Sequence, residues 1–213
     1  MVGRRLSLAA AAAFIGVFIG AGVGLAGCSP KPEAPPKPSF NAIDITGAEY
    51  ARGFELTDVE GSRRTLAEFK GRIAVVFFGF TQCPDVCPST LIELAEVKKA
   101  LGADGDRVQG IFITIDPARD TPEVLKAYVG NFGADFVALR GSEAETRAVG
   151  KHFKIFYAKV PGKGGADSYT MDHTAGLFVF DPQGRVRLFT RQNSEAQALL
   201  ADLKLLLAEA PPA

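Results

Sequence analysis

The sequence is poor in cysteine, histidine and methionine, and it has no net charge. Its 213 residues include only 3 cysteines, 2 histidines and 2 methionines. Its 24 basic and 24 acidic side chains give a formal net charge of zero, so no overall positive field attracts nucleic acid. We therefore expect no nucleic-acid partner. The chain contains no internal repeat, and its length suits one ordinary domain with short appendages.

The first 27 residues have the pattern of a targeting segment. Arg4 and Arg5 precede an almost unbroken apolar stretch at residues 6–25. This stretch ends in LAGC at residues 25–28, which resembles a bacterial lipobox. In this interpretation residues 1–27 are a signal peptide, and Cys28 carries a lipid that anchors the protein to the membrane. The alternative is a single N-terminal transmembrane anchor, because about 20 apolar residues can span a bilayer. Both place the rest of the chain on the periplasmic side of the cell envelope.

The next segment is too rich in proline to fold by itself. Five prolines and two lysines lie between residues 29 and 39. Such a segment cannot bury a core and is typical of an extended tether. We therefore assign residues 28–48 to the lipidated cysteine and its tether, and residues 49–210 to one folded domain.

The folded part alternates predicted strands and helices. Apolar and β-branched runs bounded by turn residues predict strands, and apolar residues at helical spacing predict helices. Strands are predicted at residues 54–57, 64–66, 73–78, 107–115, 136–139, 154–160, 175–181 and 185–190, and helices after Cys87, after Thr121, and at 142–153 and 195–208. This order indicates an α/β fold, with a mixed central sheet flanked by helices and an added N-terminal hairpin.

Two cysteines follow the most apolar of these strands. Residues 73–78 predict a strand that is buried on both faces. A residue before proline avoids the helical conformation, so we place Cys83 in the loop and Cys87 at a helix start, with Pro88 as the first helical residue. The helix N-terminus favours the thiolate, whereas the apolar strand and Asp85 oppose it. We expect Cys83 and Cys87 to be a redox-active pair that can form a disulfide in an oxidising compartment.

Two cysteines alone do not complete a metal site, and one histidine of the chain can supply a third ligand. His173 lies between a glycine-rich segment, predicted to be mobile, and a predicted strand, whereas His152 follows a helical pattern. Thiolates suit Cu(I), and imidazole suits copper in both oxidation states, so two thiolates and one imidazole form a possible copper site. A closed zinc site normally has four protein ligands and would need Asp or Glu here. A lone histidine is more often structural, and the spacing from Cys87 to His173 does not establish that they meet.

Three motifs occur in order along the chain: GFTQCPDVCP at residues 79–88, DPARDTP at 116–122 and DH at 172–173. Through these motifs, residues from about 53 to 208 resemble the Sco family of membrane-tethered, thioredoxin-fold copper proteins. The resemblance implies a thioredoxin-like fold and copper, Cu(I) or Cu(II), bound by Cys83, Cys87 and His173. It also implies a metallochaperone that delivers copper to, or reduces the thiols of, the dinuclear copper site of cytochrome c oxidase. Its partners would be the copper-site subunit of that oxidase, other periplasmic copper chaperones and thioredoxin-like reductants.

Residues beside the candidate ligands have open roles. The Asp172 carboxylate can orient His173 or modulate the metal site without binding the metal itself, and it can equally face solvent. Asp85 can modulate the thiols or contact a partner, or it can only shape the turn. Met171 carries a soft thioether and would share a face with His173 on an extended segment, but we favour packing for it. Residues 116–120 are expected to build a loop near the site without direct chemistry.

A second class of function needs only the cysteine pair. An extracytoplasmic thiol–disulfide oxidoreductase, or a redox or copper sensor, would use Cys83 and Cys87 alone. Redox thioredoxins usually carry two residues between their cysteines and a cis-proline opposite them. This chain carries three residues, and His173 and Thr174 occupy the place of that proline. Both features favour metal binding over thiol reductase activity, although the two can form one cycle because metal binds only the reduced pair.

Overall fold

A computed structural model describes residues 39–133, 135–162, 168–191 and 195–209 of the chain. The chain divides into two units, Met1–Lys37 and Pro38–Ala213, and only the second contains described residues. The predicted signal peptide, Cys28 of the lipobox and the tether up to residue 38 therefore lie outside the described residues. Within the described ranges, no helix is long and apolar enough to span a bilayer.

The centre of the folded unit is strand β4 (Ile73–Gly79), which is buried along its whole length. It pairs in parallel with β5 (Val108–Thr114) on one side and antiparallel with β9 (Gly176–Phe180) on the other. The eight strands of this mixed sheet have the order β1-β10-β9-β4-β5-β6-β2-β3. The remaining strands are β6 (Val137–Arg140), β10 (Val186–Arg191), β1 (Ile43–Asp44), β2 (Glu55–Asp58) and β3 (Arg63–Thr65). The mixed sheet and the N-terminal hairpin β2–β3 confirm the predicted fold class.

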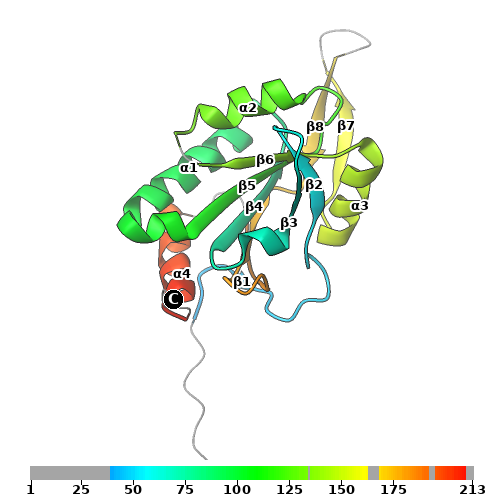
Figure 1. Ribbon diagram of the computed structural model, residues 1–213. Coiled ribbons are helices and arrows are strands. Elements are labelled where there is room, and N and C mark those ends of the chain that lie inside the picture. Colours follow the sequence, from blue (N-terminus) through cyan, green and yellow to red (C-terminus); the bar gives the residue numbers. More distant parts are fainter. Residues whose placement is uncertain (1–38, 134, 163–167, 192–194, 210–213) are drawn as a thin grey trace, which may run out of the picture. The chain divides into compact units, whose positions relative to one another are not determined.

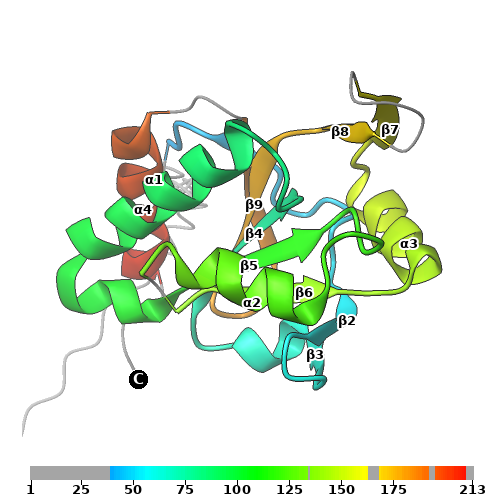
Figure 2. The ribbon, with the colours of Figure 1, turned by 90° about the horizontal axis from the view of Figure 1, so that it is seen from above.

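Helices cover both sides of the sheet. Helix α1 (Val86–Ala100) packs against α4 (Ala196–Glu209) on one side, and α3 (Glu143–Phe153) lies on the opposite side (Figure 1, Figure 2). Helix α2 (Pro122–Gly130) follows β5 and begins after Thr121, as predicted, and the Thr121 side chain caps it. Two short 3-10 helices, Leu66–Phe69 and Gly102–Arg107, precede β4 and β5. The arrangement is thioredoxin-like.

Alternate side chains of β4 point to the two faces of the sheet. Phe78 packs against Phe153 of α3 and Phe178 of β9, with ring centroids 4.9 and 6.3 Å away. Phe77 packs against Phe112 of β5, with ring centroids 5.8 Å apart. Gly79 shares the face of Phe77, and this alternation directs the last residue of β4 toward the helix that follows the cysteine loop.

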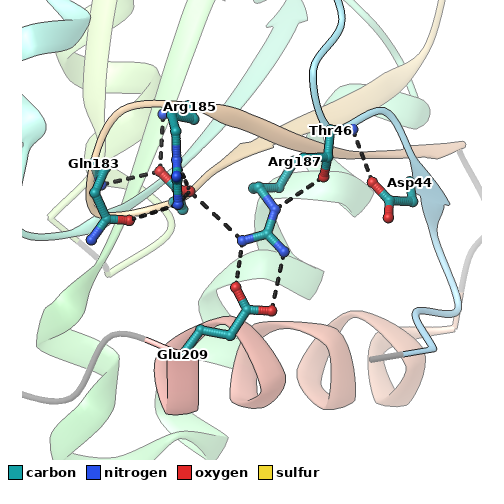
Figure 3. A network of polar contacts seen from close by, with 7 residues as sticks. Asp44, Thr46, Gln183, Arg185, Arg187 and Glu209 are labelled. Carbon is teal, nitrogen blue, oxygen red and sulfur yellow. Dashed lines mark hydrogen bonds and ion pairs between the residues drawn. The ribbon is translucent and has the colours of Figure 1, made fainter. Parts of the chain in front are cut away.

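The segment before residue 49 also belongs to the sheet. Strand β1 pairs antiparallel with β10, and the Asp202 carboxylate of α4 accepts two backbone N–H groups just before β1, both at 2.8 Å. Arg187 of β10 donates to the Thr46 hydroxyl and to the Glu209 carboxylate at the end of α4 (Figure 3). The folded unit thus includes residues before position 49, at which the sequence places the start of the domain.

Three elements differ from those predicted. Helix α1 begins at Val86, so Pro88 is its third residue; the first-turn N–H groups have no acceptor within the helix, and proline is tolerated there. The strand predicted at residues 154–160 is β7 (Tyr157–Pro161), because Lys154 ends α3 in the left-handed conformation with φ 55°. Strand β8 (Tyr169–His173) pairs with β7, and together they form a separate two-stranded sheet.

Candidate metal centre

The two cysteines lie where the chain leaves the carboxyl end of β4 and enters α1. Cys87 is fully buried in the first turn of α1, whereas Cys83 is partly exposed in the preceding loop. Both are free thiols, and the backbone N–H of Cys87 points toward the Cys83 sulfur from 3.4 Å. Gly79 leaves the space for this arrangement, because a Cβ atom at its position would lie 2.8 Å from the Cys87 sulfur.

The two thiols differ in how readily they ionise. A hydrogen bond from the Cys87 thiol lowers the pKa of Cys83 to about 5, although burial opposes the shift. The backbone N–H groups of Cys87 and Asp85 and the nearby His173 lower the same pKa further. The bond to Cys83 and burial raise the pKa of Cys87 well above its usual range. At neutral pH, Cys83 is therefore the thiolate and Cys87 is the thiol that donates to it.

The side chains flanking the candidate ligands divide into exposed acids and a buried methionine. Asp85 and Asp172 are both exposed. The sequence predicts that Asp85 opposes the thiolate, whereas its backbone N–H stabilises it. The Ser89 hydroxyl donates to the Asp85 carboxylate from 3.3 Å. Met171 is only 7% exposed and belongs to the hydrophobic core, which agrees with the packing role favoured for it.

His173 ends strand β8 and rests against aromatic residues that lead into the cysteine loop. Its ring centroid lies 6.5 Å from that of Phe77 and 6.0 Å from that of Phe80, both in edge-on geometry. Its Nδ1 atom lies 3.0 Å from the backbone oxygen of Thr174. If that contact is a hydrogen bond donated by Nδ1, the Nε2 atom keeps its lone pair for a metal. The fold therefore brings His173 to the same end of the sheet as Cys83.

The three candidate ligands do not form a closed cluster in this arrangement. Among the residues that the structure describes, no three His, Cys, Asp or Glu side chains are grouped closely enough to hold a metal ion. His173 lies in the separate β7–β8 sheet, so its strand is not fixed to β4 by a backbone ladder. A three-ligand site would require the imidazole to approach the thiols. The glycine-rich segment predicted to be mobile falls largely at residues 163–167, outside the described residues.

The loop at residues 116–120 contributes more to the site than the sequence indicated. Asp120 is buried and accepts hydrogen bonds from the hydroxyls of Thr81 at 2.7 Å and Thr114 at 2.5 Å. Burial raises the pKa of Asp120, and these hydrogen bonds oppose the shift. Arg119 donates to the Gln82 side chain, next to Cys83, from 2.9 Å. The position of this loop in the sequence could have indicated its role, because loops that follow adjacent parallel strands meet at the same edge of a sheet.

Tyr128 of α2 is a further residue that sequence reasoning missed. Its hydroxyl is buried and has no hydrogen-bond partner among the described residues. Burial raises its pKa, and the thiol groups of Cys87 and Cys83 add to this effect, so the phenol remains protonated. Tyr128 takes this position because α2 packs against β5, where the Tyr128 ring lies against Phe112. No local sequence pattern indicates this packing.

Comparisons with known proteins show which proteins the chain resembles in sequence and fold. The family model described as SCO1/SenC matches residues 44–208. A SCO2-like protein of Rickettsia felis is 34% identical over 172 residues, which cover 80% of this chain and 84% of that protein. The structure of Bradyrhizobium japonicum ScoI with copper bound is 41% identical, with a TM-score of 0.66, and covers 73% of this chain and 98% of that one. Apo Sco1 of Thermus thermophilus is 35% identical, with a TM-score of 0.70, and covers 79% and 98%.

Proposed function

The chain belongs to the SCO1/SenC family, and from this premise we propose that it binds copper through Cys83, Cys87 and His173. In this role it handles copper for cytochrome c oxidase in the cell envelope. It delivers copper to the dinuclear copper site of the oxidase, or its Cys83–Cys87 dithiol reduces a disulfide of that site to two thiols before copper enters and is itself oxidised to a disulfide. We further propose that Cys28 carries a lipid that keeps the domain at the membrane.

One observation carries the copper proposal. A thiolate at Cys83 lies beside the Cys87 thiol, and the only histidine at that end of the described sheet faces the aromatic residues that lead into their loop. Two sulfurs and one imidazole nitrogen are a donor set that copper accepts in both oxidation states. The related ScoI of Bradyrhizobium japonicum was solved with copper bound, which supports the same cargo here.

Binding and release both follow from the properties of these ligands. Cys83 is already ionised, so copper has only the Cys87 proton to displace. Cys83 and Cys87 would hold Cu(I) as thiolates, and His173 would be the third ligand of the copper. Since this third ligand lies on a separate small sheet, a partner can compete for the copper at that position.

The ionisation of the cysteines favours one alternative. A partly exposed thiolate next to a buried thiol is also the arrangement of a thiol–disulfide oxidoreductase, in which Cys83 attacks and Cys87 resolves the mixed disulfide. In that case the protein would reduce a disulfide of the oxidase copper site to two thiols and itself become the Cys83–Cys87 disulfide, or it would act as a redox sensor, without His173.

Replacing His173 by alanine separates these functions, and His152→Ala is the matched control because His152 is the other histidine of the chain. We expect His173→Ala to retain the Cys83–Cys87 disulfide, to weaken Cu(II) binding strongly and Cu(I) binding less, and to fail in oxidase assembly. Copper affinities by competition, thiol counting and oxidase activity of complemented cells measure these effects. Full assembly with His173→Ala would replace the copper proposal by the oxidoreductase.

A further inference from the structure

The β7–β8 hairpin carries one candidate ligand, and within the described part of the chain no backbone ladder joins it to the main sheet. Its described backbone pairs run between its own two strands, from Tyr157 opposite His173 to Pro161 opposite Tyr169. The position of His173 relative to Cys83 therefore depends on the short link from His173 to β9, which pairs with β4, and on side-chain contacts that cross from the hairpin to the cysteine loop. Such contacts decide how often the imidazole is within reach of the thiols.

Besides the His173 ring, which lies against Phe77 and Phe80, Arg119 makes several of these crossing contacts. The Arg119 guanidinium donates through Nη1 to the side-chain oxygen of Gln82 at 2.9 Å and to the backbone oxygen of Tyr169 at 2.8 Å. It also forms an ion pair through Nε with the buried carboxylate of Asp116. Gln82 directly precedes Cys83, and Tyr169 begins the strand that ends at His173. Arg119 thus contacts both halves of the candidate centre and its own loop.

Ring contacts and a second hydrogen bond strengthen the same connection. The guanidinium carbon of Arg119 lies 3.7 Å from the ring centroid of Tyr169 and 5.9 Å from that of Phe80. The Tyr169 hydroxyl donates to Asp116 at 2.9 Å. Tyr169 is therefore held through its carbonyl, its ring face and its hydroxyl. The Arg119 side chain is 20% exposed, so solvent screens these charged contacts only in part.

The connection depends on the shape of arginine as well as on its charge. A guanidinium is planar, stacks on an aromatic face and directs several donors at fixed angles, whereas a lysine ammonium is a single compact charge. The Arg119 guanidinium donates to Asp116 and to two other acceptors, while its plane covers the Tyr169 ring. Lysine would keep the charge but would lose either the stacking on Tyr169 or some of the hydrogen bonds that the guanidinium donates.

We propose that Arg119 is a positioning residue for copper, which fastens the β7–β8 hairpin to the cysteine loop and so sets the distance between His173 and the two thiols. The proposal rests on the copper function proposed above. Arg119 acts through the hairpin and does not ligate the metal itself. Removing it should leave the dithiol intact but let His173 move away from the thiols.

The test compares Arg119→Met, Arg119→Lys and Tyr169→Phe with wild type, with Arg64→Met as the matched control. Arg64 is a 26% exposed arginine that pairs with Asp58 and Glu68 and lies over the Phe69 ring. We expect Arg119→Met to weaken Cu(II) binding by about 10- to 100-fold, the usual effect of losing a group that orients a ligand, with a much smaller effect on Cu(I). The histidine-nitrogen signature in Cu(II) electron paramagnetic resonance should weaken as well. Arg119→Lys should resemble Arg119→Met, Tyr169→Phe should show a smaller loss, and Arg64→Met should show none.

Amide hydrogen exchange of the reduced, copper-free proteins gives a readout that needs no metal. Exchange in β7 and β8 should rise in the Arg119 variants and stay unchanged in Arg64→Met. Wild-type Cu(II) affinity and exchange in Arg119→Met would overturn the proposal, and so would full restoration by Arg119→Lys, since charge alone would then suffice. If Arg119→Met does not fold, Arg119→Lys and Tyr169→Phe decide by the same readouts. A wild-type protein without a histidine-dependent Cu(II) signal would refute the copper function, and the exchange data would still test the connection.

Discussion

Replacing Gly79 by alanine tests whether the end of β4 holds the cysteine pair in place. A Cβ atom at this position would lie 2.8 Å from the Cys87 sulfur, 2.8 Å from Phe112 and 2.9 Å from Phe77. Real Cβ contacts are essentially never shorter than 3.0 Å, so at least one neighbour must shift. All three neighbours are buried, with at most 1% of each exposed, and none can turn away into solvent.

The expected effect is a loss of stability together with a change at the thiols. Overpacking of a filled core costs about 1–3 kcal/mol. For a domain of this size, that free energy of unfolding corresponds to a Tm lower by roughly 2–12 °C. If Cys87 moves away from Gly79, its hydrogen bond to Cys83 weakens, and the pKa of Cys83 should rise because that bond is the main cause of its low value.

The assay combines thermal unfolding of the reduced protein with the pH dependence of Cys83 alkylation. Gly130→Ala is the matched control, because a Cβ atom at residue 130, the last of α2, would meet nothing within 4 Å. The control should keep the wild-type alkylation profile and should not lower the Tm, because alanine favours a helix more than glycine does. A Gly79→Ala protein with both properties unchanged would refute the packing argument, since the cavity would then tolerate a methyl group beside Cys87.

Three further predictions concern the cysteines. Alkylation of Cys83 should be nearly independent of pH above about 6 and should slow below about 5, because its pKa is lowered to about 5; a rate that climbs up to about pH 8.5 would indicate an ordinary thiol. The Cys83–Cys87 disulfide should form reversibly and should exclude copper, because the thiolates are the ligands; equal copper uptake by reduced and oxidised protein, measured by metal analysis, would contradict this. Cys28→Ser should block lipid labelling and leave an unprocessed precursor on a gel, whereas a mature-sized, labelled product would exclude the lipobox.

Much of the fold could be predicted because its signals are local. Strand β4 is a continuous apolar run, and α2 begins after the predicted cap Thr121; α3, predicted from residue 142, begins at Glu143, with Ser142 as its cap. Strand β1 has only two residues, both exposed, and therefore shows no periodic pattern. The pairing of β8 with β7 depends on their meeting in space, because β7 has no alternating burial pattern and β8 alternates over only five residues around the single buried Met171.

The candidate site was predictable in part for the same reason. Cys83 and Cys87 are close in sequence, so their proximity follows from one turn and one helix start. The place of His173 depends on the path of the whole chain, so its residue type could be read from the sequence but its distance from the thiols could not. The contacts of Arg119 with Gln82 and Tyr169 join three segments far apart in sequence, and no local pattern predicts them.

X-ray absorption at the copper edge tests the central claim most directly. The reduced protein loaded with one equivalent of Cu(I) should show two sulfur ligands and one nitrogen ligand, and His173→Ala should lose the nitrogen while both sulfurs remain. His152→Ala should give the wild-type spectrum. A nitrogen contribution that persists in His173→Ala, or a copper ion held by a single sulfur in wild type, would contradict a site built from Cys83, Cys87 and His173.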